Sequence, residues 1–367
     1  MISSGRNVAT IITAENLQQL AREMLKAGYR VIAPAKQADL VVFKAIQDAR
    51  EMLPEGEYIL PQASFKEFVF PRSECILRYR FGEDKKPVFE SPNLDGEPQQ
   101  AVIGCRPCDA ASLPILDKIF GWDYVDPFYF RRREKTAVIS IACSRAGEGC
   151  FCTSAGYAPD ATAGSDILLK KMGTAPNFPQ SATETVSSGK AIGPCPHFLA
   201  EVLSDKGRQL AEKFGGLFEK VDAAPPVEVA DVKPAFDVEK IKPWLDAHFE
   251  DPLWLEIAAR CMGCGTCAYG CPTCHCFDIV DEGDLAGGCR LKNWDTCSSS
   301  LFTKHGSGHN PRSSQEQRYR QRVMHKFKYY LEKFGLRACV GCGRCTLRCP
   351  VNLDLRGVLQ TIASKQG

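Results

Sequence analysis

The stretches CMGCGTCAYGCP (261–272) and CVGCGRCTLRCP (339–350) repeat one pattern: three cysteines spaced three residues apart, then a fourth that precedes a proline. Three thiolates at this spacing can bind one Fe4S4 cube from a single tight loop, and the fourth points away and binds a second cube. The pattern therefore predicts two neighbouring [4Fe-4S] clusters with crossed ligation. We assign Cys261, Cys264, Cys267 and Cys349 to the first cluster, and Cys339, Cys342, Cys345 and Cys271 to the second.

Zinc is the alternative metal for such cysteines. A structural zinc site takes four ligands in two pairs, whereas each stretch here holds a complete run that ends in Cys-Pro. We therefore favour clusters. Glycines beside the ligands, such as Gly263 and Gly341, allow backbone N–H groups to approach the sulfurs. We also expect the neighbouring Arg260, Arg344 and Arg348 to raise the reduction potentials of these anionic clusters.

Composition sets the wider class. The 367 residues are 44% hydrophobic, which is enough for two domains, and the net charge of +2 does not favour binding to nucleic acid or to an anionic membrane. No apolar run approaches the roughly 18 residues of a membrane span. The start, MISSGRNVAT, lacks the pattern of a signal peptide, so we expect a cytoplasmic protein. An odd count of 19 cysteines in such a chain indicates metal or redox chemistry rather than disulfides.

The first 222 residues predict a mixed α/β domain. A helix capped by Thr13 has apolar residues between Leu17 and Leu25 on one face. Two more helices are expected at residues 109–120 and 199–214. Short apolar runs that are typical of buried strands lie at residues 31–33, 40–43, 101–104 and 137–142.

Residues 223–237 are rich in proline and lack a helical period, so we expect a linker there. Residues 238–367 then form the second domain. Asp251-Pro252 is a good start for a helix that leads to Cys261, and residues 315–334 are helix-prone and free of proline. The predicted fold is therefore α+β, with a mixed α/β domain followed by a helical, ferredoxin-like domain that holds two [4Fe-4S] clusters.

Several segments together resemble one family. They are CMGCGTCAYGCPTCHCFDI (261–279), WDTC (294–297), HNPRSSQEQRYRQRVMHKFKYY (309–330) and the second cysteine stretch, with GCRPCD (104–109) and CFC (150–152) upstream. The chain is similar to the β (iron–sulfur) subunits of cytosolic sulfhydrogenase-type [NiFe] hydrogenases and to the A subunit of anaerobic sulfite reductase, which are 4Fe-4S dicluster proteins. The resemblance covers nearly the whole chain.

The resemblance implies an electron-transfer subunit with two kinds of partner. One is a flavin subunit that binds FAD and NAD(P), and the other is a catalytic subunit with its own iron–sulfur subunit, most simply a hydrogenase. The chain itself has no GxGxxG fingerprint after a strand and no recognisable catalytic site. Two alternatives stay open: the equivalent subunit of a sulfite reductase or other reductase, and a non-redox regulatory or structural metal module.

The other cysteines allow further hypotheses. Five of them lie near the ends of predicted strands. They could hold a third metal centre or line a surface that faces the flavin, or they could be buried side chains that act as small hydrophobic groups. This group is Cys105, Cys108, Cys143, Cys150 and Cys152. For Cys274 and Cys276 we favour packing or support of a cluster, and for Cys75, Cys195, Cys289 and Cys297 a structural role. The basic run from Arg312 to Lys328 is expected to form a solvated helix face, with docking of an acidic partner as the alternative.

Overall fold

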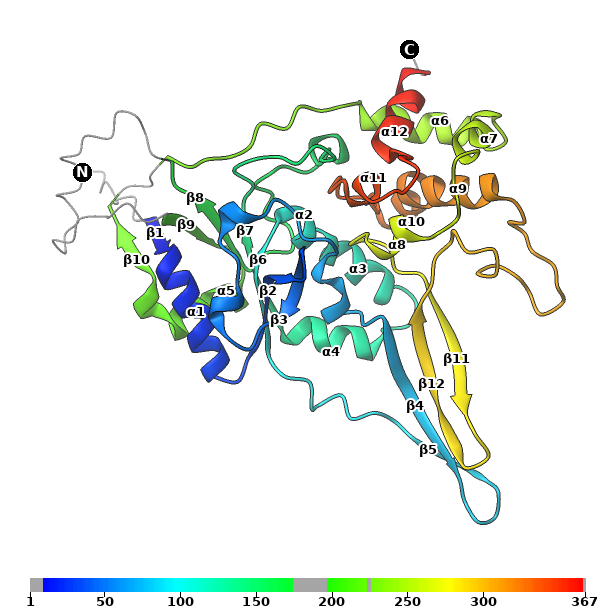
Figure 1. Cartoon of the computed structure of the whole chain (residues 1–367), viewed down its shortest axis with the longest axis horizontal. Coiled ribbons are helices and arrows are strands. Elements are labelled where there is room, and N and C mark those ends of the chain that lie inside the picture. The colour runs from blue at the N-terminus through cyan, green and yellow to red at the C-terminus, as the bar shows by residue number, and fades with distance from the viewer. Residues whose placement is uncertain (1–8, 174–196, 223–225, 366–367) are drawn as a thin grey trace, which may run out of the picture.

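The computed structural model describes residues 9–173, 197–222 and 226–365 (Figure 1). Its largest element is an eight-stranded sheet in the order β10-β1-β9-β8-β7-β6-β2-β3. The neighbours β2, β6, β7 and β8 run parallel, and the remaining pairs are antiparallel. The strands are β1 (Ala9–Thr13), β2 (Arg30–Gln37), β3 (Leu40–Ala45), β6 (Gln100–Cys105), β7 (Thr136–Ile141), β8 (Ile167–Lys171), β9 (His197–Val202) and β10 (Glu219–Val221).

Helices cover both faces of this sheet, because its strands are apolar on both sides. On one face α1 (Ala14–Lys26) and α5 (Asp205–Lys213) pack over residues such as Ile103 and Ile139. On the other face α2 (Pro107–Ala110), α3 (Ser112–Phe120) and α4 (Pro127–Lys135) pack over Val102 and Val138. The result is a three-layered α/β unit, which confirms the mixed α/β fold expected for this part of the chain.

Most elements predicted here are confirmed, and one is wrong. Thr13 caps α1 by accepting a hydrogen bond from the Asn16 backbone N–H at 2.9 Å. The helix expected at residues 199–214 begins only at Asp205, after the N-cap Ser204, because residues 197–202 form β9 between β1 and β8. The short apolar run at residues 197–202 is compatible with a helix or a strand, and pairing with two neighbouring strands makes it a strand.

The C-terminal part is mainly helical, as predicted. Its helices are α6 (Ile241–Ala247), α7 (Leu253–Ala258), α8 (Thr266–Tyr269), α9 (Gln315–Met324), α10 (Tyr330–Phe334), α11 (Arg344–Leu347) and α12 (Leu355–Ser364). One π-helical stretch, His325–Tyr329, joins α9 to α10. A core that includes Trp244, Trp254, Phe327 and Leu359 holds these helices together. No helix in the described ranges is long and apolar enough to cross a membrane.

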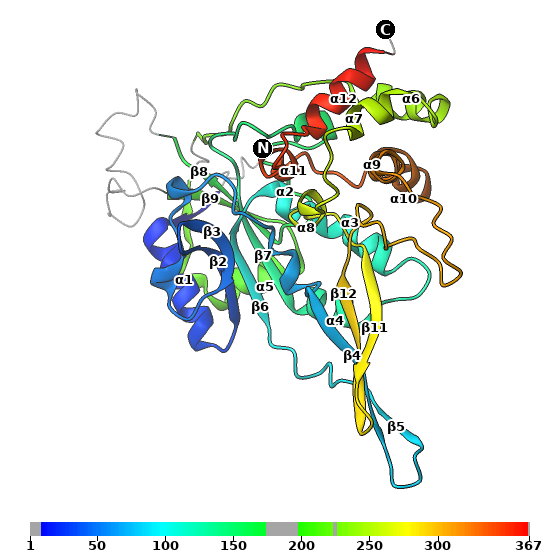
Figure 2. The same ribbon diagram turned by 45° about the vertical axis from the view of Figure 1, so that its right-hand side comes forward.

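A second sheet was not predicted. Its order is β11-β12-β4-β5, from β11 (Phe277–Gly283), β12 (Gly287–Trp294), β4 (Ser73–Phe81) and β5 (Pro87–Glu90). Figure 2 shows this sheet extending away from the rest of the molecule. The hairpin β11–β12 lies between the two cysteine motifs, yet β12 pairs with β4 from the N-terminal part. The division into domains at residues 223–237, of which 223–225 lie outside the described residues, stays a prediction.

The two parts also meet through a buried ion pair. Arg344 follows Cys342 in the second motif, and its guanidinium donates to both carboxylate oxygens of Asp109 at 2.5 and 2.9 Å. Both side chains are essentially inaccessible, at 1% and 0% exposure. Beside them, a Cβ on Gly343 would lie 2.2 Å from the carbonyl oxygen of Gly149, and Gly343 has φ of +75°. Only glycine permits this backbone contact.

The buried pair gives a testable prediction. Asp109→Ala leaves Arg344 buried without a counter-charge, so we expect it to lower the free energy of unfolding by about 3–5 kcal/mol. The measurement is the urea midpoint of the full-length chain in anaerobic buffer. The matched control is Glu23→Ala, which removes the exposed pair with Lys26 and should leave the midpoint unchanged. An unchanged midpoint for Asp109→Ala would show that this pair does not hold the two parts together.

Candidate iron–sulfur site

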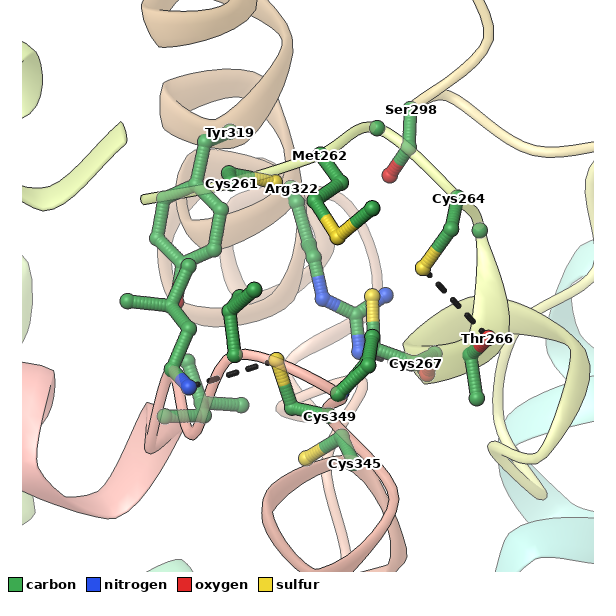
Figure 3. A pocket seen from close by; sticks show the side chains of 16 residues that line it. Cys261, Met262, Cys264, Thr266, Cys267, Ser298, Tyr319, Arg322, Cys345 and Cys349 are labelled. Atoms are coloured by element: carbon green, nitrogen blue, oxygen red, sulfur yellow. Dashed lines mark hydrogen bonds between the residues drawn. The ribbon is translucent and has the colours of Figure 1, made fainter. Parts of the chain in front are cut away.

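The four cysteines predicted for the first cluster line one cavity. Cys261, Cys264 and Cys267 approach it from the first motif, and Cys349 approaches it from the second. The cavity measures about 30 Å³, and Figure 3 shows its lining side chains, with Arg322 reaching in among them. These side chains therefore have the crossed arrangement that the Cys-Pro endings predict. Ligation of a cluster by them stays a prediction.

A second cavity gathers the other four predicted ligands. Cys271 reaches it from the first motif, and Cys339, Cys342 and Cys345 reach it from the second. Its volume is about 10 Å³. Cys345 lines both cavities, so the two groups of thiols are immediate neighbours. Two clusters held here would lie close together.

The repeated backbone of the two motifs produces this arrangement. Gly265 and Gly343 have φ of +73° and +75° and precede the short helices α8 and α11. A left-handed residue at this place turns the loop sharply, so that the cysteines before and after it face the same cavity. The fourth cysteine of each motif follows its short helix and faces the cavity of the other motif.

Polar groups already contact two of the sulfurs in the first cavity. The Leu353 backbone N–H donates to Cys349 Sγ at 3.2 Å, and the Gln315 side-chain amide donates to Cys261 Sγ at 3.1 Å. Such donors stabilise a thiolate more than a thiol, and they raise the potential of a cluster that it binds. Gln315 lies at the start of α9 in the segment between the motifs, and its role was not predicted.

Burial opposes ionisation of the thiols in the second cavity. It raises the pKa of Cys345 to about 12, and it raises the pKa of Cys339 and Cys342 as well. Thiolates are the form that binds iron, so cluster binding at this site must release protons. Nearby positive charge is needed to make that release favourable.

Two buried cations provide this charge. Arg322 donates to the Cys267 carbonyl at 2.8 Å and to Cys274 Sγ at 3.5 Å. Lys326 donates to the Ala338 carbonyl at 2.7 Å and lies 3.5 Å from Cys271 Sγ. Burial opposes the charge on both, but the surrounding cysteines raise the pKa of each. Among the residues that the structure describes, neither forms an ion pair with a carboxylate, and both are only 3% exposed.

The expectation of a solvated basic face is therefore wrong for this part of the segment. Arg320, Arg322 and Lys326 are buried. A signal was present, because residues 322 and 326 are four apart and share one helix face. Sequence reasoning instead favoured Arg344 as a neighbour of the clusters, but that guanidinium is already paired with Asp109.

The N-terminal cysteines gather around the second motif. Cys108 packs against a buried cluster that includes Cys342, and the Phe151 N–H donates to the Gly341 carbonyl at 2.9 Å. Burial raises the pKa of Cys143 to about 12 and that of Cys152 to about 11. In the described ranges, no set of three Cys, His, Asp or Glu side chains is arranged to hold a single metal ion. A third centre formed by Cys105, Cys108, Cys143, Cys150 and Cys152 stays a prediction.

The remaining cysteines fall into two groups. Cys75 and Cys289 lie on the neighbouring strands β4 and β12 with their thiols in contact, and Cys195 is outside the described residues. Cys274, Cys276 and Cys297 share a third cavity beside the second one. Their gathering was not predicted, because the hairpin that joins them was not.

A larger cavity of about 490 Å³ lies apart from the motifs. It opens at the ends of β6 and β7, where Gly104 and Ile141 line it together with Tyr58 and Glu55. Its position at the carboxyl edge of parallel strands is where α/β folds commonly bind ligands. None of the described residues that line it is a cysteine.

The fold and the cysteine-lined cavities are typical of an iron–sulfur protein. Residues 260–353 match the family model described as a 4Fe-4S dicluster domain. The chain is also 29% identical, over 92% of its length, to sulfhydrogenase 2 subunit beta of Pyrococcus furiosus, and the match covers 93% of that protein. No solved structure matches the chain. These findings confirm the predicted resemblance to the iron–sulfur β subunits of sulfhydrogenases.

The crossed cavities give the second prediction. Cys271→Ala should perturb the cluster held with Cys339, Cys342 and Cys345, and Cys349→Ala should perturb the other one, because each removes a thiol from the opposite motif's cavity. Electron paramagnetic resonance of the reduced variants, compared with the native spectrum, should show a different signal altered in each. The control is Cys75→Ala, remote from both cavities. The same signal altered by both variants would contradict crossed ligation.

Proposed function

We propose that this chain carries electrons, through two [4Fe-4S] clusters, between a subunit that binds FAD and NAD(P) and a catalytic subunit with its own iron–sulfur subunit. The catalytic partner that we favour is a cytosolic [NiFe] hydrogenase, since the named relative is a sulfhydrogenase subunit. The cytoplasm is the compartment that we propose. Catalysis takes place on the partner, and this chain provides the connection.

The observation that carries the proposal is the shared wall of the two cavities. Because Cys345 lines both, clusters held there would be neighbours, and an electron could pass between them over a short distance. The first cavity lies near the surface, where Cys264 is exposed and the adjacent Met262 is 69% exposed. A redox centre of a partner could therefore approach the first cluster closely, which an electron path requires.

Buried positive charge supports redox work rather than a structural role. Reduction adds a negative charge to a cluster, and Arg322 and Lys326 would stabilise that charge at close range with little screening by water. A structural cluster would use this charge only to keep its thiolates ionised, whereas a redox cluster uses it again each time it is reduced. This argument favours electron transfer over the regulatory or structural alternative.

The identity of the catalytic partner is tested by its metals. The equivalent subunit of a sulfite reductase would have the same cavities, because the electron-transfer task is the same. Nickel in the purified native complex supports the hydrogenase, whereas sirohaem supports the sulfite reductase.

The third prediction concerns cofactor content. Anaerobically reconstituted full-length chain should hold at least about eight iron and eight sulfide, four of each per cluster. Iron and acid-labile sulfide assays measure this directly. Saturation at one or two metal ions, with zinc dominant, would contradict the clusters and favour a structural zinc module.

The fourth prediction concerns the electron path. A complex that lacks this chain should lose NAD(P)-coupled turnover but keep turnover with viologen, because a small dye can exchange electrons directly with the catalytic subunit. The two activities are measured on the same preparations, with the intact complex as the control. NAD(P)-coupled turnover that persists at the native rate would place this chain off the path.

A further inference from the structure

Three cysteines outside the two motifs lie on a third cavity. Cys274 and Cys276 follow the first motif in the sequence PTCHCF, and Cys297 follows β12. The cavity measures about 10 Å³, the same as the cavity of the second cluster site. His275 and His325 also line it, together with Arg322 and Lys326. It therefore combines soft ligands with positive charge, as the two motif cavities do.

The hairpin brings two of these cysteines together. Strand β11 begins directly after Cys276 and β12 ends shortly before Cys297, and the register pairs Phe277 with Trp294. The Asp295 N–H continues the ladder by donating to the Cys276 carbonyl at 3.0 Å. The two thiols consequently line the same cavity. Because the hairpin fixes both Cys276 and Cys297, they provide two ligands at fixed positions for a metal site.

Helices and loops provide the rest of the site. Cys274 contacts the sulfur of Cys271, so the third cavity adjoins the second cluster site. His325 faces the cavity from the first residue of the π-helical stretch, a conformation that is rare and often found at functional sites. The His275 ring lies 5.3 Å from the His325 ring and is tied by Nδ1 to the Thr273 carbonyl.

Among the described residues, the cations around this cavity have no carboxylate partner. Lys66 is 4% exposed and donates to the Cys274 carbonyl at 2.7 Å, with its ammonium over the Trp294 ring. In the ranges that the structure covers, Lys66, Arg322 and Lys326 make no ion pair with a carboxylate. A buried charge is costly unless it is paired. The N-terminal cysteine group differs, because its cations Arg106 and Arg344 pair with Glu55 and Asp109.

We propose that Cys274, Cys276 and Cys297 bind a third [4Fe-4S] cluster, with His325 as its fourth ligand. This proposal rests on the two-cluster function proposed above. Three thiolates and a neutral imidazole give the cluster a net negative charge, which Lys66, Arg322 and Lys326 would help to stabilise. The ligands of an Fe4S4 cube surround four iron atoms and therefore lie farther apart than the ligands of one metal ion. The lack of a single-ion site in the described residues is thus consistent with the proposed cluster. Arg322 lines all three cavities and would lie among three clusters.

The test is the metal content of the full-length chain, isolated anaerobically. We expect about twelve iron and twelve sulfide in the native protein, and about four fewer of each in the double variant Cys276→Ala with Cys297→Ala. The matched control is Cys75→Ala with Cys289→Ala, another contacting pair across the same sheet, which should keep the native content. A native content of about eight leaves the two-cluster function intact and overturns the third cluster. A content of one or two metal ions instead contradicts the function itself.

Further comparisons locate the site. If Cys150→Ala with Cys152→Ala removes four iron while the hairpin variant does not, the third centre belongs to the N-terminal group and our assignment is wrong. Thiol trapping and mass spectrometry that find a Cys276–Cys297 disulfide in the native, iron-loaded protein would also overturn it. His325→Cys should keep the iron content and change the paramagnetic signal of one cluster only, and an unchanged spectrum would exclude His325 as the ligand. The native count decides the cluster number even where a variant does not fold.

Discussion

The burial of Arg322 and Lys326, with no carboxylate partner among the residues that the structure describes, is the constraint on which the C-terminal architecture depends. Placing two positive charges inside a protein is unfavourable unless negative charge lies beside them. The groups that surround these side chains are cysteines and backbone carbonyls. The apolar face of the helix that carries both cations packs into the core, and the motif loops make the burial of its two charges favourable. The loops in turn gain thiolates stabilised by those charges. Fold and cofactor chemistry support each other through these two residues.

The same principle organises the contact between the two parts of the chain. Asp109 gives Arg344 a buried counter-charge, while glycines in the second motif allow the backbone at residues 149–152 to approach closely. The N-terminal unit thus forms one wall around the second motif. A ferredoxin-like segment that in isolation would expose its loops is enclosed here, with the surface near Cys264 left open.

Local signals in the sequence predicted much of this structure, and long-range pairing accounts for what they missed. Thr13 and the apolar period after it define α1 within one segment, and the cysteine spacing defines which thiols share a cavity. The strand at residues 197–202 looked helical, because its neighbours β1 and β8 are not adjacent in the sequence. The hairpin pairs with β4, some two hundred residues earlier, and without it nothing brings Cys276 to Cys297. Arg322 and Lys326 were expected at the surface, because charge is usually found there.

The crossing of the two motifs also has a consequence for the order of events during synthesis. Each cavity takes thiols from both motifs, so neither is complete until the second motif has left the ribosome: the second cavity needs Cys345, and the first needs Cys349. Until then the first motif offers three thiols to one cavity and a single thiol to another that does not yet exist. A nascent chain therefore cannot be loaded in sequence, one centre after the other. Maturation has to wait until both motifs have been synthesised, and a chain truncated after residue 338 would lack both centres rather than one.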